Sequence, residues 1–569
     1  MTNSRLLSLW PCTLLALTIA CGSSSPTNTD PDAGLVGDAD AGPTVDPSEE
    51  LFRPDHIVKV TITLAPADWD VLRNQPEVIG MPKITCGNQP TEKPYTYFPA
   101  DVTVDGVTVT NVGVRKKGGF GSLSTARPGL KVKATEFTSG QRIFGLKRLT
   151  LNNNHQDDTR ISQCLGYDLF RQAGVAAPRC NFAHVTVNGE DLGVYSNVET
   201  IKKAFLRRHF DDDEGRLYES GGEFLPGRTD GFQPKTNKEA PDCSDLPPVA
   251  TAIQASDADF PSALGAVVDI DAFTTYWAME VITDHWDGLA NNQNNHFFYH
   301  DPTSDKFHFI PWGIDALFTG RARTTRPDSV FACGSLPWRM YDVPETRTLY
   351  LAKLRQLLDS VWDESAILAE ITRMQTLIEP IADPTSSGDL AARIQNTRDF
   401  VSTRKADLLA ELDAGPPVWP YAAGEESCRI NLGTISGTFS TTWDTLDDFG
   451  TGSGTFNGSV GSDSITSTEV LANAGLSGEG QGLIQMLSLM PDGRYAVVLL
   501  IIQDPVDVTP GTMALDLVNV AAIMMFYDPV SDTSSGGGLM LNGSVTLTSA
   551  MTSAGAAIIG SFNGDVLEL

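Results

Sequence analysis

The chain has 569 residues, of which 41% are hydrophobic, so it is long enough for more than one domain and apolar enough for ordinary cores. Its 41 Lys and Arg residues against 71 Asp and Glu residues give a formal net charge of −30. This balance argues against a nucleic-acid partner, because binding proteins neutralise the phosphates of nucleic acids with Lys and Arg.

The N-terminus reads MTNSRLLSLWPCTLLALTIAC, with one Arg, an apolar stretch and a small residue before a cysteine. This pattern is typical of an export signal. Its LTIAC ending resembles the lipobox of bacterial lipoproteins, with Thr18 where a leucine is usual. The resemblance implies a lipid on Cys21 and anchoring to the membrane of the bacterial envelope, at the outer membrane or the cell surface. A plain cleaved signal or an uncleaved apolar segment is the alternative.

Residues 22–50 are rich in Ser, Pro, Asp and Gly and have almost nothing to bury, which predicts a disordered tether. Apart from Cys12 and Cys21, six cysteines remain along the chain. An even number in an exported protein predicts up to three disulfides, and Cys164 and Cys180 are near enough in sequence to pair. The absence of a CxxC pair argues against a zinc site.

The region 51–222 is predicted to be strand-rich. HIVKVTITLA, ADVTVDGVTVTNVGVRKK and FAHVTVNGEDLGVYSNVE alternate apolar and polar residues, with DG and NG turns. Between them, ISQCLGYDLFRQAG has helical spacing and a terminal Gly. The Pro- and Gly-rich stretch 223–259 is interpreted as a loop excursion.

Helices are predicted to dominate residues 260–415. DIDAFTTYWAMEVITDHW opens on Asp269, a good N-cap, and three further amphipathic patterns follow. After GPPVWP the composition shifts to Gly, Ser and Thr. Short apolar runs separated by turns predict an all-β sandwich or barrel over 421–569, without a catalytic constellation.

One stretch, DHWDGLANNQNNHFFYHDPTSDKFHFIPWGID, places polar side chains between short strand-like runs. An Asp, an Asn and a second Asp that converge at the ends of paired strands would make an oxygen-ligand site for a hard cation. Its first residue, Asp284, is interpreted as a solvated charge at a helix end, with a helper role as the alternative.

Residues 51–412 resemble the CotH kinase family, named after spore coat protein H. The matching pieces occur in order and include NVGVRKKGGFGS, RPGLKVKA, FGLKRLTLNNNHQDDTRISQCLGYDLF, GRLYE, VVDIDAFTTYWAMEVITDHWDG, NNHFFY and FIPWGIDALF. The resemblance implies an α+β, atypical protein-kinase-like domain over 51–415. It also implies transfer of a phosphoryl group from ATP, with Mg²⁺ or Mn²⁺, to a protein hydroxyl.

The resemblance also implies roles for single residues. Asp287 in HWDG matches the catalytic aspartate, for which a turn-forming Asp is the alternative. Asn295 matches the metal-binding asparagine, with Asn292 as the alternative. Family members carry PWDxD where this chain has PWGID, so Gly313 replaces one metal-binding Asp and Asp315 retains the other. The loss of a carboxylate ligand weakens metal binding.

Phosphate-contacting cations are expected on two strands. Lys131 and Lys133 alternate in LKVKA and so share a face, as do Arg115 and Lys117 in RKKGG. A strand lysine paired with a glutamate is the known kinase arrangement, and Glu199 is the candidate partner. Solvation of a strand face is the alternative for these lysines.

Three further features have two interpretations. Trp312 either stacks on an adenine or belongs to the core. His155 and the acidic run 211–214 invite a metal site, but turn and surface roles are favoured.

The predicted function is therefore an exported, lipid-anchored kinase that acts on an unidentified surface or envelope protein. A catalytically inactive scaffold, favoured by Gly313, is one alternative, and an adhesion lipoprotein, suggested by the acid content, is another.

Overall fold

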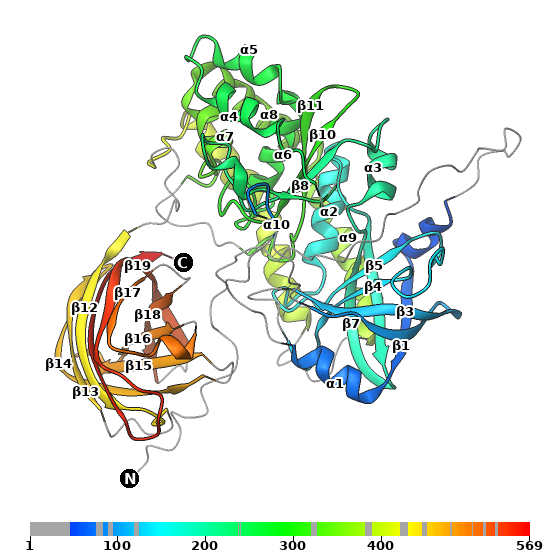
Figure 1. Cartoon of the computed structure of the whole chain (residues 1–569). Helices are drawn as coiled ribbons and strands as arrows, with labels where there is room; N and C mark the ends of the chain where they lie inside the picture. The colour runs from blue at the N-terminus through cyan, green and yellow to red at the C-terminus, as the bar shows by residue number, and fades with distance from the viewer. Residues whose placement is uncertain are drawn as a thin grey trace, which may run out of the picture. The chain divides into compact units, whose positions relative to one another are not determined.

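The computed structural model describes residues 46–75, 84–88, 95–118, 124–236, 238, 240–319, 327–381, 390–421, 431–446, 452–477, 481–502, 504–515, 519–529 and 533–568. They form two compact units, a larger one that ends at residue 421 and a smaller one that begins at residue 431 (Figure 1). The predicted signal, the predicted lipidation site Cys21 and most of the predicted tether lie outside the described residues.

The larger unit opens with a closed barrel in which the strands follow the order β1-β2-β3-β4-β5-β7-β6. The expected alternation is present, since Val58, Val60 and Ile62 of β1 point into an apolar barrel core while their neighbours face outward. Strand β1 pairs in parallel with β6, which closes the ring. The strands are β1 (Ile57–Leu64), β2 (Phe98–Val104), β3 (Val107–Lys117), β4 (Gly129–Lys133), β5 (Arg148–Asn152), β6 (Cys180–Val187) and β7 (Glu190–Val198).

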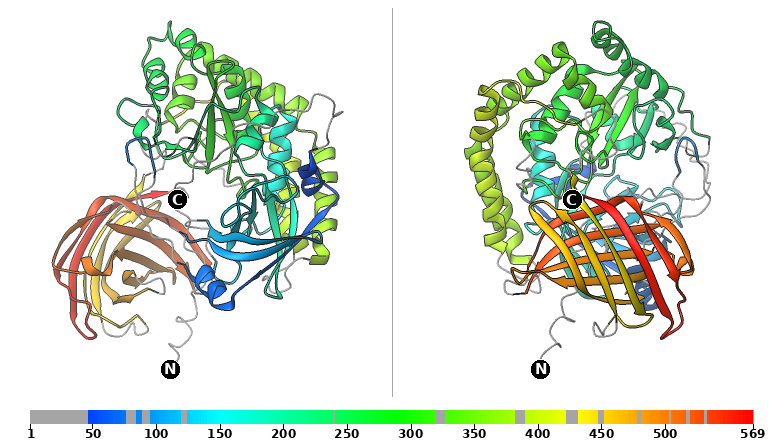
Figure 2. Two further views of the ribbon diagram at one scale, coloured as in Figure 1. Left: turned by 45° about the vertical axis from the view of Figure 1, so that its right-hand side comes forward. Right: turned by 90° about the vertical axis from the view of Figure 1, so that its left-hand side faces the viewer.

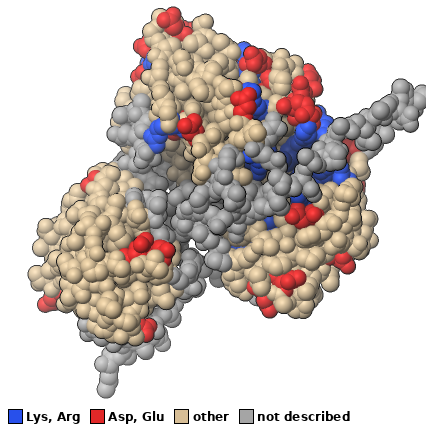
Figure 3. All heavy atoms as spheres, in the orientation of Figure 1, with Lys and Arg blue, Asp and Glu red and all other residues tan. Residues whose placement is uncertain are grey.

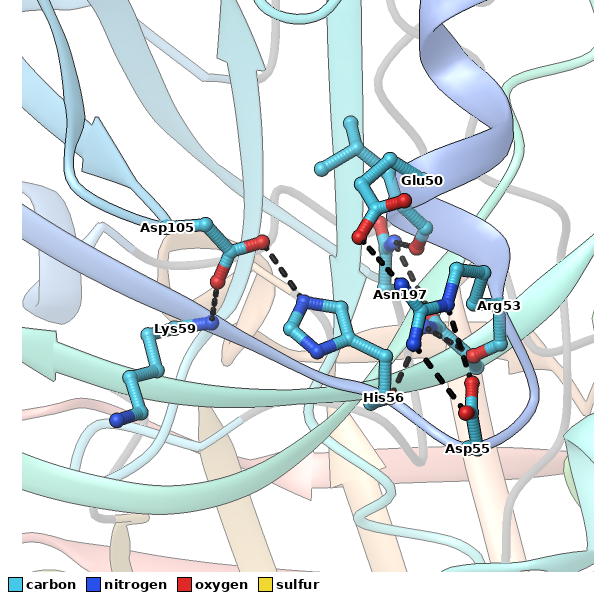
Figure 4. A network of polar contacts seen from close by, with 9 residues as sticks. Glu50, Arg53, Asp55, His56, Lys59, Asp105 and Asn197 are labelled. Carbon is cyan, nitrogen blue, oxygen red and sulfur yellow. Dashed lines mark hydrogen bonds and ion pairs between the residues drawn. The ribbon is translucent and has the colours of Figure 1, made fainter.

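The last residues of the predicted tether belong to this unit. Pro47–Phe52 forms a 3-10 helix (η2) whose cap is Asp46. Polar contacts tie the segment that follows to the barrel (Figure 4). The Asn197 amide donates to the Leu51 carbonyl oxygen at 3.0 Å, and the His56 ring lies 2.8 Å from the Asp105 carboxylate. The folded unit thus begins about five residues before the predicted boundary.

A mixed helical part follows the barrel and holds a four-stranded sheet of order β11-β10-β8-β9. Its central helix, α6, is capped as predicted by Asp269, which accepts a hydrogen bond from the Ala272 amide at 3.0 Å. The side chains from Phe273 to Ile282 are all buried, so α6 is a core helix rather than a surface helix with one apolar stripe. The sheet strands are β8 (Arg216–Glu219), β9 (Gln233–Pro234), β10 (His296–Asp301) and β11 (Lys306–Pro311).

The helices of the larger unit include every one that the sequence predicted. They are α1 (Pro66–Asn74), α2 (Ser162–Gln172), α3 (Lys203–His209), α4 (Leu246–Ile253), α5 (Phe260–Gly265), α6 (Ile270–Ile282), α7 (Ser335–Asp342), α8 (Pro344–Ser360), α9 (Glu364–Ile378) and α10 (Leu390–Asp413). The interpretation of 223–259 as a loop was wrong in part, because α4 and β9 lie there. Prolines at the first helical positions of α4 are compatible with a helix, and its apolar side chains are buried.

The smaller unit is all-β, as predicted, and its strands follow one another round a closed ring (Figure 2). The order is β12-β13-β14-β15-β16-β18-β19-β20, and the pairing of β19 with β20 closes it, which selects the barrel over the sandwich. Its interior is filled by an apolar core. The strands are β12 (Asn431–Thr442), β13 (Ser453–Val460), β14 (Asp463–Leu476), β15 (Gly482–Leu489), β16 (Tyr495–Ile502), β17 (Gly511–Ala514), β18 (Val520–Asp528), β19 (Thr533–Ser549) and β20 (Ala557–Glu568).

Two disulfides join parts of the larger unit. Cys164 on α2 pairs with Cys180 on β6, as predicted, and Cys86 pairs with Cys243. Cys333 is also disulfide-bonded, and Cys428 lies outside the described residues. None of the helices in the described part of the chain is long and apolar enough to cross a membrane.

Candidate active site

The loop that carries Asp287 is built on the last turn of α6. There the buried Glu280 carboxylate accepts hydrogen bonds from the main-chain amides of Leu289 at 2.9 Å and Ala290 at 2.8 Å. A Cβ atom on Gly288 would lie 2.1 Å from Oε1 of Glu280. The glycine of HWDG is therefore required by this contact, and Glu280 fixes the loop directly after Asp287.

Three asparagines of the run converge on the buried Asp287 carboxylate. The side-chain amide of Asn292 donates to Oδ1 at 2.6 Å, and that of Asn295 donates to Oδ2 at 2.5 Å. The Asn294 amide lies 3.3 Å from both oxygens. The structure thus brings both candidate asparagines to Asp287. It also buries Asp284, which contradicts the interpretation of that residue as a solvated charge.

Asn295 also joins this loop to the segment after β11. Its Nδ2 atom donates to the main-chain oxygen of Gly313 at 3.0 Å. Gly313 has φ +60°, and a Cβ atom there would lie 2.6 Å from Cγ of Asn295. The Asn295 side chain therefore occupies the space that any side chain at position 313 would need. Its Oδ1 atom accepts no hydrogen bond from a described residue, so this oxygen is available to a cation.

Asp315 connects the same segment to the barrel. Its buried Oδ2 atom accepts a hydrogen bond from the Asn152 amide at 3.3 Å, at the end of β5. The Nζ atom of Lys117 lies 3.4 Å from Oδ1 of Asn152. Burial raises the pKa of the Asp315 carboxyl above its ordinary value, and the charge of Lys117 opposes that shift.

The donors at this site suit a divalent cation, but they are not a cluster of acidic side chains. The described residues contain no group of three or more His, Cys, Asp or Glu side chains arranged to hold a metal. The oxygens of Asp315 and Asn295 are the hard donors that Mg²⁺ and Mn²⁺ take, usually together with water and substrate phosphate. The acid that the family pattern has at position 313 is the one that is missing.

The four predicted cations lie on the outer face of the barrel, as their alternation with the interior Leu130 and Val132 requires. Arg115 stands opposite Lys131 across β3 and β4. Lys133 forms an ion pair with Glu136 at 2.7 Å. Burial, with the neighbouring Arg115 and Lys117, lowers the pKa of Lys131 well below its ordinary value. The main chain of Lys131 pairs with β3 and β5, but its Nζ atom makes no hydrogen bond or ion pair with a described residue, so the ammonium group can bind a ligand.

The predicted partner of a strand lysine is differently placed. Glu199 is buried and forms ion pairs with Arg179, at 3.1 Å, and with Arg208. A different acid, Glu219 at the end of β8, pairs with Lys235 and lies near Lys131. Glu219 ends the GRLYE piece but was not predicted as a partner of a lysine. The cation with which it pairs, Lys235, lies in the stretch 223–259 that was interpreted as a loop.

The remaining candidates have structural contacts. The Trp312 ring packs edge-on against Phe297, with centroids 5.5 Å apart, beside the apolar cores of the unit. His155 is exposed. In the acidic run, Asp213 forms an ion pair with Arg207 at 2.8 Å and Glu214 pairs with Lys203, so this run has the surface role that was favoured. Asn152 and Gln163, 2.9 Å apart, support Asp315 and were not singled out from the sequence.

Comparison with known proteins gives the family of the chain. The family model described as CotH kinase protein matches residues 114–408, more than half of the chain. The chain belongs to the CotH kinase family. The match includes Lys117, Lys131, Asp287, Asn295 and Asp315, so every element of the candidate site lies within the CotH domain.

Two relatives are similar to this CotH protein over most of that domain. It is 24% identical to inner spore coat protein H of Bacillus subtilis over 272 residues, 45% of this chain and 74% of that protein. It is 24% identical to invasin CotH7 of Rhizopus delemar over 264 residues, 42% of this chain and 44% of that protein. A crystal structure of the Helicobacter pylori proinflammatory kinase CtkA aligns with 56% of this chain and 92% of its own, with 8% identity and a TM-score of 0.23. No detail of the fold can be transferred at that score.

Proposed function

We propose that this CotH protein is a kinase that transfers the γ-phosphoryl group of ATP to a hydroxyl of a surface or envelope protein. One observation supports the proposal most. The segment after β11 links Asp287, through Asn295 and the Gly313 oxygen, to Asp315, which in turn contacts Asn152 beside Lys117. Phosphoryl transfer needs this combination of a base, oxygen donors and a cation.

Asp287 is the proposed base. The acceptor hydroxyl oxygen forms a bond to the γ-phosphorus as the bond from that phosphorus to the ADP oxygen breaks, and the hydroxyl proton passes to the Asp287 carboxylate. The amides of Asn292 and Asn295 hold both carboxylate oxygens in one orientation, so the base is positioned before the acceptor arrives.

Asn295 and Asp315 are the residues proposed to hold Mg²⁺ or Mn²⁺, which when bound neutralises charge on the phosphates. Lys117, which bonds to Asn152 next to Asp315, would contact the phosphates from the barrel. Of the two β4 lysines, Lys131 is preferred for a phosphate contact over Lys133, because Glu136 already pairs with Lys133.

Calorimetric binding of ATP tests the proposal, with Mg²⁺, with Mn²⁺ and without a divalent cation. We expect metal-dependent binding that is lost in Asp315→Ala. In Asp287→Ala, binding should persist while phosphorylation of a generic protein acceptor stops. Asp70→Ala, an exposed acid on α1, is the matched control and should behave as the unmodified chain. A folded chain that binds no ATP with either cation would refute the kinase proposal.

A catalytically inactive scaffold is the second candidate, and Gly313 is the observation that favours it. The Asn295 side chain occupies the space of the missing ligand. The unmodified chain separates the two candidates. A scaffold that folds binds no ATP with Mg²⁺ or Mn²⁺, whereas the kinase binds it with either cation.

We also propose that the chain is exported and acylated on Cys21, as the names spore coat protein and invasin of the two relatives suggest a surface location. Incorporation of labelled palmitate in a bacterial host tests this. Cys21→Ser should abolish labelling, whereas Cys12→Ser, the matched control, should not. Labelling that survives Cys21→Ser would rule out this anchor.

A further inference from the structure

The barrel of the smaller unit carries a regular array of short hydroxyl and amide side chains on its outside. Ile435, Phe439 and Phe562 belong to the apolar core, so their neighbours along β12 and β20 point outward. The same alternation holds on β13, β17 and on the part of β19 that pairs with β17. We call the outward side chains of these five strands the hydroxyl face.

Strand register arranges the hydroxyl face in rows. One row crosses all five strands and consists of Thr512, Thr546, Ser561, Thr438 and Thr455. The next row lies two residues further along each strand and consists of Ser544, Asn563, Ser436 and Asn457. Neighbouring strands are about 4.8 Å apart, and alternate residues of one strand are about 6.8 Å apart. The face is therefore a lattice of uncharged groups that both donate and accept hydrogen bonds.

Part of this hydrogen-bonding capacity is unused within the described part of the chain. The hydroxyls of Thr438 and Thr455 lie 2.9 Å apart, and so do those of Thr512 and Thr546. Between these two pairs, the exposed Ser561 hydroxyl bonds to no described residue. The exposed Asn563 side chain, in the next row, also makes no such bond. The centre of the hydroxyl face can therefore bond to a ligand.

The charges of the smaller unit are distributed differently from those of the larger one. Arg494 is the single Lys or Arg in residues 431–569, and two aspartates hold it in ion pairs. Figure 3 shows mainly tan side chains, with scattered red ones, on the visible face of this unit. The two rows of the hydroxyl face carry no charge. The exposed side chains of the other barrel, in contrast, include Lys59, Asp101 and Asp191.

The composition of the two rows excludes several classes of partner. Nucleic acids and other polyanions are bound through Lys and Arg, which the rows lack. Protein interfaces are enriched in aromatic residues and Arg and depleted in Ser, which is the opposite of this composition. Lipid chains need large exposed apolar side chains. A neutral polymer of hydroxyl groups suits the face, because its hydroxyls can exchange hydrogen bonds with the rows without the burial of a charge.

We propose that the hydroxyl face binds a neutral polysaccharide, whose sugar hydroxyls replace water along both rows. Outer strand faces of other β-barrels are known to bind oligosaccharides. Short side chains lose little rotamer freedom when a ligand orders them, so each contact has a low entropic cost. Repeated weak contacts along one polymer then raise the overall affinity. The face lies outside residues 114–408, which the family model matches, so the proposal does not rest on phosphoryl transfer.

Co-sedimentation of the whole chain with insoluble neutral polysaccharides tests the proposal. The polymers are cellulose, chitin, a β-1,3-glucan and cross-linked dextran. We expect at least one of them to bind the chain, and this binding to persist at about 1 M salt, where charges are screened within about 3 Å. Absence of binding to all four polymers would overturn the proposal. Binding that is lost at high salt would also overturn it, since the acids of the chain would then be responsible.

A double variant locates the binding on the hydroxyl face. Thr438→Val/Thr546→Val removes two hydroxyls of the first row and keeps the branched shape of both side chains. The matched control, Thr103→Val/Thr108→Val, removes an exposed pair of threonine hydroxyls, 2.8 Å apart, from the barrel of the larger unit. Affinity for the bound polymer should fall about tenfold in the first variant and less than about twofold in the control. Equal losses in the two variants would overturn the assignment.

A second variant separates loss of binding from loss of folding. Asn563→Asp keeps the shape of an exposed side chain and adds a charge to the second row. Affinity should fall about tenfold, because a charge is costly to bury against a neutral polymer, while the midpoint of urea denaturation stays unchanged. Normal binding by this variant would contradict the proposal. Asp287→Ala and Asp315→Ala should bind the polymer as the unmodified chain does, so the kinase proposal and this one can fail independently.

Discussion

Asn295 fills the space beside Gly313 so closely that a Cβ atom at position 313 would lie 2.6 Å from the Asn295 Cγ atom. Gly313→Ala should therefore lower the free energy of unfolding by more than the about 1–2 kcal/mol that a left-handed backbone costs a residue with a side chain. Chemical denaturation of the chain measures this.

The control for that substitution is Gly174→Ala. Gly174 also has a positive φ, +83°, but no atom lies within 4 Å of its Cβ position. Gly174→Ala should therefore lower the free energy of unfolding by the backbone cost alone. Equal losses of stability in Gly313→Ala and Gly174→Ala would mean that the Asn295 side chain moves aside freely.

Gly288→Ala should disrupt the loop that carries Asp287. Its Cβ atom would lie 2.1 Å from Oε1 of Glu280 and 2.6 Å from Nδ1 of His285, both buried. We expect a loss of about 2 kcal/mol or more, as for other overpacked buried sites. Gly265→Ala on α5 is the control, because its nearest contact is at an ordinary 3.4 Å. A Gly288→Ala chain as stable as this control would contradict the contact.

Asp157 should make stability depend on pH. It is buried before α2, where it accepts a hydrogen bond from the Ser162 amide at 2.9 Å. Burial raises its pKa from 3.8 to about 6. The folded chain therefore holds the proton more tightly than the unfolded chain. The stabilisation of the folded chain by the Asp157 proton is complete below pH 4 and is lost as pH rises through 6. The loss is about 3 kcal/mol in total.

Asp157→Asn keeps the acceptor for the Ser162 amide and removes the charge. Denaturation curves at several pH values should show equal stability near pH 4 and a more stable variant above pH 6. Other buried acids with raised pKa values, such as Glu223, contribute equally to both chains and cancel. A constant difference across the pH range would show that Asp157 does not titrate there.

The Cys164–Cys180 disulfide should contribute about 3 kcal/mol, because it closes a loop of 16 residues and so restricts the unfolded chain. Cys164→Ala/Cys180→Ala should lose this amount in urea denaturation under oxidising conditions. Cys180→Ala alone should lose nearly the same, since either substitution removes the bond. A single variant that stays close to the unmodified chain would argue against the linkage.

The sequence by itself determined most of the elements and one half of the candidate site. Alternation along β1 and helical spacing in α2 and α10 are local signals, and they hold wherever the chain then packs. Asp287 and Asn295 are eight residues apart in one loop, so their contact also follows from local sequence. The stretch 223–259 was misjudged because two of its prolines, Pro247 and Pro248, sit at the start of α4, where burial of apolar side chains stabilises the helix.

Only the tertiary structure decided the other half of the candidate site, which comprises Asp315 and the charged partners on the barrel. Asp315 meets Asn152, 163 residues away, and Glu219 pairs with Lys235 rather than Glu199 with a strand lysine. Strand alternation shows which face carries a charged side chain but not which distant element covers that face. The partner of a buried charge depends on how the barrel and the helical part fold against each other, because desolvation there selects the nearest opposite charge over any pairing that sequence order suggests.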